Sequence, residues 1–187
     1  MENEQARIEL AAAHRGLAHY GLNEGVNNHI SVITKVSLSD DIVEIKAFVQ
    51  SQFDPEKEIM LMLPFGVLWS EAIPEVMIEV DYNNKTYYSS NGNEIELDFE
   101  KRTMELLMNL PLDAAYYLHS EIYKTCSNLR AIVHTHSRFV SSLTSLDNFQ
   151  IKPVHQNSCR FIKNIGYDRT YGRDFAYRRY IHCILIV

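Results

Sequence analysis

The chain has 187 residues, of which 46% are hydrophobic and 22% are charged, and its net charge is −6 at pH 7. This length fits one domain with a sizeable core, and the composition excludes disordered, collagen-like and coiled-coil classes. The acidic balance argues against nucleic acid as the main partner.

Amphipathic helices are predicted where apolar residues recur three and four positions apart, over residues 4–21, 112–124 and 138–146. Short or alternating apolar runs predict strands over residues 30–34, 43–49, 59–63, 77–82, 86–89 and 129–133, the last of them buried. Beyond Phe149 the periodicity fades. The order of helix, several strands, helix, strand and helix is typical of a fold in which helices cover a mixed sheet.

Charge and cysteine placement bear on partners and location. From Cys159 onward the net charge is +4, which leaves −10 on residues 1–158. We interpret this basic segment as a solvated face, with contact to an anionic partner as the alternative. The three cysteines are scattered, the first residues are polar and acidic, and no apolar stretch approaches the roughly 20 residues of a membrane span. The sequence predicts a cytoplasmic protein with reduced thiols and no transmembrane segment.

The pair His134 and His136 is the most informative motif for chemistry, because it follows directly on the apolar run 131–133. Positions i and i+2 of a strand project from the same face, so the two imidazoles come together at its carboxyl end. Open α/β sheets bind ligands there, and two neutral imidazoles suit a divalent metal such as zinc. The alternative is a structural pair of hydrogen-bonded histidines.

Other histidines have weaker interpretations. His119 lies on the apolar face of the second helix, where packing with a hydrogen bond is the simpler role and orienting a neighbouring ligand is the alternative. His155 and His182 are the histidines that follow the pair, and each is a candidate third metal ligand. The loops 27–29 and 64–66 adjoin strands and could present backbone N–H groups to an anion. Ordinary turns are the alternative for both loops.

Five ordered motifs resemble the class II aldolase/adducin family. They are LAAAHRGL at 10–17, NHIS at 28–31, LPFGVLWSE at 63–71, LHSEIY at 118–123 and AIVHTH at 131–136. The resemblance covers residues 6–172 and weakens after 153. It divides the chain into a family-like domain, residues 1–172, and a divergent C-terminal segment, residues 173–187, as in a member truncated at its C-terminus.

The resemblance implies a three-layer α/β/α sandwich around a mainly antiparallel sheet, assembled as a homo-oligomer. In the enzyme branch a divalent metal, usually zinc, is held by the histidine pair and a later histidine, and it polarises a small phosphorylated sugar. By position, His134 and His136 match the metal pair. His29 and Gly66 match the loops that hold the substrate, and His119 lies behind the metal ligands.

Departures from the enzyme branch put aldolase chemistry in doubt. The acid/base glutamate of that branch stands four residues before the helix histidine, where this chain has Ala115, which cannot exchange a proton. Asp113 is offset by two residues and so points about 200° away on a helix. His29 stands where sugar-phosphate aldolases have asparagine. In the enzyme branch the third metal histidine lies in a later strand, which this chain is not expected to reach.

These departures resemble the adducin branch, whose head domains serve the membrane skeleton with actin and spectrin. The first hypothesis is therefore an adducin-like domain without aldolase chemistry, which acts through assembly or through cytoskeleton and plasma-membrane contacts. The second is a zinc-dependent carbon–carbon lyase, with a replaced acid/base and His155 or His182 completing the metal site. The third is a defective family member whose apolar end, residues 180–187, is prone to aggregation.

Overall fold

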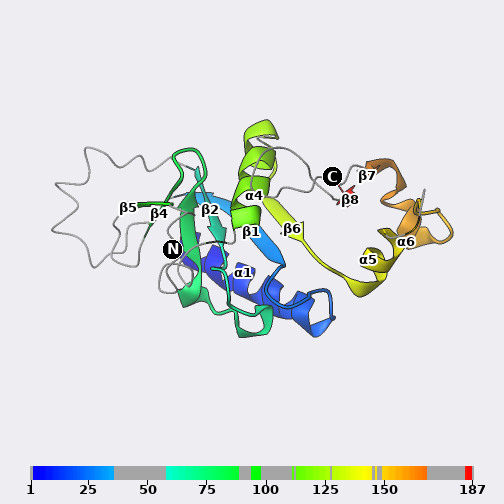
Figure 1. Cartoon of the computed structure of the whole chain (residues 1–187), viewed down its shortest axis with the longest axis horizontal. Helices are drawn as coiled ribbons and strands as arrows, with labels where there is room; N and C mark the ends of the chain where they lie inside the picture. The colour runs from blue at the N-terminus through cyan, green and yellow to red at the C-terminus, as the bar shows by residue number, and fades with distance from the viewer. Residues whose placement is uncertain are drawn as a thin grey trace. The chain divides into compact units, whose positions relative to one another are not determined.

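An antiparallel sheet organises the first part of the computed structural model (Figure 1). The structure describes residues 2–35, 58–88, 94–97, 111, 113–126, 128–144, 146, 149–167 and 184–186. The chain divides into two compact units, Met1–Ser137 and Arg138–Val187, and each is described by itself.

Six strands of the first unit pair in the order β5-β4-β3-β2-β1-β6, and every pairing is antiparallel. Their bounds are β1 His29–Lys35, β2 Glu58–Met62, β3 Ile78–Asp81, β4 Thr86–Tyr88, β5 Glu94–Glu96 and β6 Ala131–His134. The β1–β6 register places His29 directly opposite His134. That pairing brings the start of one strand to the end of the other, where the candidate site lies.

One face of the sheet packs against helix α1, Glu2–His19, and two short 3₁₀ helices, η2 Trp69–Glu71 and η3 Pro74–Val76. This cluster includes Leu10, Leu61 and Trp69, each 2% exposed or less. The turn that follows α1 contains Gly21, whose φ of +66° suits glycine. Leu22 N–H donates to the Leu17 carbonyl and Gly21 N–H to the Ala18 carbonyl.

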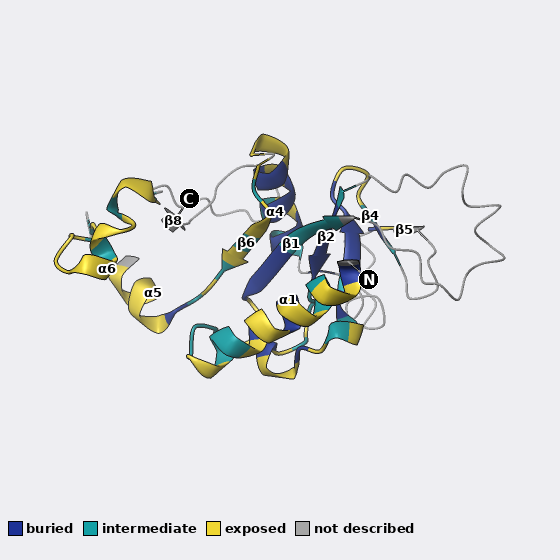
Figure 2. Cartoon of the chain, turned by 180° about the vertical axis from the view of Figure 1, so that it is seen from behind, coloured by how far each residue is buried: buried dark blue, intermediate teal, exposed yellow. Residues whose placement is uncertain are grey.

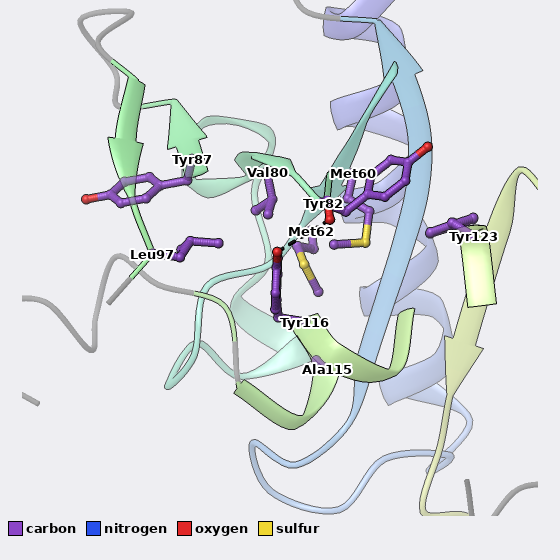
Figure 3. Close-up of a cluster of buried hydrophobic side chains, with 9 residues drawn as sticks. All are labelled: Met60, Met62, Val80, Tyr82, Tyr87, Leu97, Ala115, Tyr116 and Tyr123. Atoms are coloured by element: carbon purple, nitrogen blue, oxygen red, sulfur yellow. Dashed lines mark hydrogen bonds between the residues drawn. The ribbon is translucent and has the colours of Figure 1, made fainter. Parts of the chain in front are cut away.

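The opposite face packs against helix α4, Asp113–Thr125. Met60 and Met62 point toward α4 while Leu61 between them belongs to the α1 cluster, as the alternation of a strand requires. Tyr116 and Tyr123 of α4 complete this second core (Figure 3). Helices on both faces of an antiparallel sheet confirm the predicted three-layer α/β fold.

A buried carboxylate fixes α1 against the sheet. Glu79 of β3 is 4% exposed and accepts hydrogen bonds from Arg7 at 2.7 Å and from Asn3 at 3.3 Å. The Asn3 side chain also accepts a hydrogen bond from Thr34 of β1. Because a buried charge is tolerated when it is paired, these contacts set where α1 lies along β1 and β3.

The second unit contains short elements. These are α5 Arg138–Thr144, α6 Gln156–Cys159, η4 Ile162–Asn164, β7 Ile165–Tyr167 and β8 Ile184–Ile186. Strands β7 and β8 pair antiparallel, and the Tyr167 hydroxyl accepts a hydrogen bond from Ile151 N–H at 2.7 Å. Cys126 of the first unit and Cys159 of the second are free and exposed.

The prediction that residues 129–133 form a buried strand is wrong in one respect. The strand exists as β6, but among the described strands it pairs only with β1, so its outer residues face solvent (Figure 2). Val133 is 52% exposed. The predicted strand 43–49 lies outside the described residues. The same is true of the C-terminal segment 173–187, except for residues 184–186. No helix in the part of the chain that the structure describes is long and apolar enough to cross a bilayer.

Candidate functional site

Four histidines from three elements meet at the end of the sheet where β1 begins and β6 ends. They are His29 of β1, His119 of α4, His134 of β6 and His136 two residues beyond it. His29 and His134 lie opposite each other in the strand register, and α4 covers this face. The cluster therefore depends on β1, β6 and α4 together.

The imidazoles of His134 and His136 come together, as their spacing of two residues predicted. Their Nε2 atoms are 2.9 Å apart and their ring centroids 4.9 Å apart, at an interplanar angle of 69°. β6 ends at His134, so His136 lies just beyond the strand, and the two rings still meet. In the metal-free cluster one of the two nitrogens donates a hydrogen to the other.

His29 links this pair to the helix. Its ring stacks on His134 with centroids 4.3 Å apart and an interplanar angle of 5°. Its edge meets His119, with His29 Nδ1 2.8 Å from His119 Nε2. His29 is 8% exposed and His119 is fully buried, so the contact lies at the inner end of the site.

Behind His119 the hydrogen bonds continue into the core. His119 Nδ1 lies 2.6 Å from Ser31 Oγ, which lies 2.9 Å from the Tyr123 hydroxyl. Tyr123 donates to the backbone carbonyl of Ser31 at 3.1 Å. Ser31 and Tyr123 were not among the predicted site residues, although a signal existed. Ser31 follows His29 by two on a strand and Tyr123 follows His119 by four on a helix, so each shares a face with a histidine.

Burial favours the uncharged form of His29, His119 and His134. Burial and, after it, the neighbouring histidines lower the pKa of His29 far below its ordinary value and that of His119 to about 3. Burial, then the neighbouring His136, lowers the pKa of His134 to about 4. Burial raises the pKa of Tyr123 to about 12. Neutral imidazoles are the form in which histidine binds metals and exchanges hydrogen bonds in both directions.

The loop before β1 holds His136 in place through Asn28, which belongs to the loop 27–29 that was predicted to face an anion. Asn28 Oδ1 accepts from His136 N–H at 2.9 Å, and Asn28 Nδ2 donates to the Glu24 carbonyl at 2.8 Å. The Trp69 indole donates to the Asn28 carbonyl at 3.1 Å. The Glu24 carboxylate lies 3.5 Å from His136 Nδ1, which favours a hydrogen on that nitrogen.

Gly66, a predicted substrate-binding residue, lies apart from this cluster as far as the contacts between described residues go. It occupies the turn after β2 with φ at +91°, a conformation that favours glycine, and an added Cβ would meet open space. No hydrogen bond between described residues joins it to the histidines. The backbone conformation of the turn is thus a sufficient reason for glycine at this position.

The His134–His136 pair fits two positions of a metal site. A tetrahedral zinc with nitrogens about 2.0–2.1 Å away holds two of them about 3.3 Å apart, so the pair needs to open by a few tenths of an ångström. The described residues contain no group of three or more His, Cys, Asp or Glu side chains arranged to hold a metal. His155 caps α6, its Nδ1 accepting from Asn157 N–H at 3.2 Å, and His182 lies outside the described residues.

Ala115, which the family resemblance matches to the acid/base glutamate of the enzyme branch, lies in the core. Ala115 is fully buried in the cluster between α4 and the sheet, next to Tyr116. Asp113 begins α4, and its carboxylate accepts a hydrogen bond from Ala114 N–H at 2.8 Å. The methyl side chain of Ala115 offers the histidine cluster no proton-exchanging group.

The sequence profile of the Class II Aldolase and Adducin N-terminal domain matches residues 8–181. Because this match covers most of the chain, and the fold and the ordered motifs agree with it, the chain belongs to the class II aldolase/adducin family. The earlier resemblance is thereby confirmed.

The similar proteins include one named as adducin-related and others named as aldolases. Adducin-related protein 1 of Caenorhabditis elegans is 26% identical over 140 residues, which are 75% of this chain and 14% of that protein. An aldolase II superfamily protein from Pseudomonas syringae aligns with a TM-score of 0.62 at 22% identity, covering 94% of this chain and 56% of the other. L-fuculose 1-phosphate aldolase from Glaciozyma antarctica aligns at 0.59 and 21% identity, covering 87% and 52%. The chain thus spans about half the length of these two solved structures, whose likeness shows the fold.

Proposed function

We propose that this chain is an adducin-like domain that lacks aldolase chemistry, binds a divalent metal through His134 and His136, and acts through assembly and protein contacts. The observation that carries the proposal is Ala115, fully buried at the position of the aldolase glutamate. A methyl group in a packed core cannot take or give the proton that carbon–carbon cleavage requires. We propose a cytoplasmic location, with cytoskeletal or plasma-membrane association and a homo-oligomeric assembly.

The metal part of the proposal is supported by the facing Nε2 atoms of His134 and His136, 2.9 Å apart. Glu24 lies beside Nδ1 of His136, as carboxylates lie beside metal-binding histidines. Zinc is our choice among divalent metals because neutral imidazoles suit it. When bound, such a metal would supply Lewis-acid polarisation of an oxygen ligand.

Metal analysis tests this part. After zinc loading and dialysis, the wild-type protein is expected to retain close to one zinc per chain, and His134→Ala/His136→Ala to retain none. His19→Ala, at an exposed position of α1, is the control for removing a histidine, and His155→Ala tests that residue as a third ligand. Equal zinc content in the wild type and the double variant would leave the pair structural and contradict the metal site.

Co-sedimentation tests the contact part. The protein is expected to pellet with actin filaments or a spectrin–actin mixture at low salt, and less of it as ionic strength rises, because charge contacts are screened. Arg160→Ala/Lys163→Ala removes two exposed cations of the basic segment and should weaken pelleting further. Absence of pelleting at low salt would count against an actin partner.

A second candidate is a zinc-dependent lyase acting on small phosphorylated sugars. It is favoured by one observation, the contact of the metal pair with His29, which matches a substrate-binding position of the family. In this case turnover is expected in the wild type and is lost in both His134→Ala and His136→Ala. Equal turnover in all three proteins would exclude the lyase, since the metal pair would then be irrelevant to it.

A further inference from the structure

The two units of the chain carry opposite charge. Residues 138–187 contain eight lysines and arginines and three aspartates, so this unit has a net charge of +5, and the total of −6 leaves −11 on residues 1–137. Among the described residues of the second unit the charged side chains are all cations and all exposed: Arg138, Lys152, Arg160 and Lys163. None of these four forms an ion pair with a described residue.

Large apolar side chains protrude from the same unit. Phe139 of α5 is 74% exposed, Val154 in the chain before α6 is 78% exposed, and Phe161 after α6 is 45% exposed. Leu143 and Leu146 follow Phe139 by four and seven residues and are exposed too, so α5 and the turn after it present an apolar stripe (Figure 2). Exposed apolar side chains gathered in so few residues mark an interaction surface.

Cations and protruding apolar side chains alternate along this unit. Each apolar side chain has a cation within two residues, in the pairs Arg138 and Phe139, Lys152 and Val154, and Arg160 and Phe161. The guanidinium carbon of Arg138 lies 5.8 Å from the centre of the Phe139 ring, so these two side chains form one amphipathic group. Such groups suit a membrane interface, where apolar side chains enter the lipid layer and cations contact headgroups.

We propose that the second unit binds the surface of an anionic membrane. Phe139, Val154 and Phe161 enter the boundary between headgroups and acyl chains, and the four cations contact anionic headgroups. The seven residues of α5 are too few to cross a bilayer, so the contact is peripheral. This inference rests on the proposed function for the membrane location and names lipid as the direct partner, and it requires neither the metal nor actin.

A lipid surface fits these observations better than an acidic protein does. Phe139 and Val154 belong to separate segments, and each projects almost wholly into solvent. A protein partner must match such projections with complementary packing, whereas the interfacial layer of a bilayer accepts them at any spacing. The net charge of +5 attracts the unit to an anionic surface, and salt screens this attraction.

Flotation of the full chain with vesicles tests the charge requirement. At low salt the protein is expected to float with vesicles of phosphatidylcholine and phosphatidylserine and not with phosphatidylcholine alone. Arg160→Gln/Lys163→Gln should weaken binding to the mixed vesicles roughly 30-fold, because each cation near an anionic surface contributes about fivefold. Arg15→Gln/Lys124→Gln removes the same charge from exposed positions of the first unit and should weaken it far less. Equal flotation with both kinds of vesicle, or none with the mixed vesicles, overturns the proposal.

Phe139→Ser/Val154→Ser tests the apolar contribution, because it leaves the charge unchanged. This variant should bind the mixed vesicles about tenfold more weakly than the wild type and should pellet with actin as the wild type does. Tyr20→Ser, at a position of the first unit that is 76% exposed, is the matched control and should bind the vesicles normally. Wild-type vesicle binding by Phe139→Ser/Val154→Ser would contradict entry of these side chains into lipid.

Val154→Trp reports entry into the lipid directly. The emission of the added indole is expected to shift to shorter wavelength with the mixed vesicles and not with poly-glutamate, which supplies negative charge without an apolar layer. Trp69 is 1% exposed and should not respond. No shift with vesicles, or an equal shift with poly-glutamate, overturns the proposal, and the second result makes an acidic protein the partner. Zinc content and actin pelleting are measured separately, so failure of this inference is distinguishable from failure of the proposed function.

Discussion

Ala115→Glu is expected to lower the free energy of unfolding by about 3–5 kcal/mol, the usual cost of an uncompensated buried charge, and to create no cleavage of sugar phosphates. The enzyme branch has glutamate at this position, so sequence alone suggests that restoring it would restore activity. In the structure Ala115 is fully buried between α4 and the sheet among Met62, Val80 and Tyr116. A glutamate there loses its hydration without gaining a cation partner.

Urea denaturation at neutral pH checks this expectation, with Ala114→Glu as the control. Ala114 is the preceding residue of α4 and is only partly buried, so a carboxylate there can reach solvent near the start of the helix. The control should cost far less stability than Ala115→Glu. If Ala115→Glu kept wild-type stability and gained metal-dependent turnover, the carboxylate would have to reach the histidines, and the lyase would become the better proposal.

Stability is expected to fall by about 3 kcal/mol through His14 alone as the pH decreases from 6.5 to 4. His14 of α1 is fully buried against Trp69, and burial lowers its pKa from 6.5 to about 4. Between these values the unfolded chain binds a proton that the folded chain does not. The contribution of neutral His14 is therefore complete above pH 6.5 and is lost as the pH falls toward 4.

His14→Phe isolates this effect, because the other buried histidines titrate in both proteins. The difference in unfolding free energy between wild type and variant should change by about 3 kcal/mol between pH 6.5 and 4, in favour of the variant at low pH. His19→Phe, at an exposed position of the same helix, controls for the added phenyl ring. A pH-independent difference between wild type and His14→Phe would contradict the prediction.

Local pattern was sufficient for much of the fold. Residues 112–124 carry a helical stripe that the structure reproduces as Asp113–Thr125, and residues 30–34 and 59–63 become β1 and β2 within one residue at each end. The 3₁₀ helices η2 and η3 were not predicted, since three residues are too few to show a period. The exposure of β6 was missed because an edge strand and a buried strand can have the same apolar residues.

Some contacts of the candidate site could likewise be predicted from local sequence, and others could not. The convergence of His134 and His136 follows from a spacing of two residues, and the sequence was enough to predict it. The contact of His29 with His119 joins residues 90 apart and depends on how α4 lies across β1. Likewise, Asn28 can accept the hydrogen bond from His136 only when the loop before β1 lies beside the chain after β6, 108 residues later. No periodicity in the sequence encodes such distances.

Asn28 connects the site to the folded core, because it receives the indole hydrogen of Trp69, a residue only 1% exposed, and it holds the backbone of His136. Any ligand that requires this arrangement binds the native chain and not the unfolded one. Its occupancy therefore adds to the conformational stability of the whole first unit, by about 2.7 kcal/mol at a concentration one hundred times the dissociation constant. A thermal shift of the first unit is consequently a direct and label-free measure of what this histidine cluster recognises.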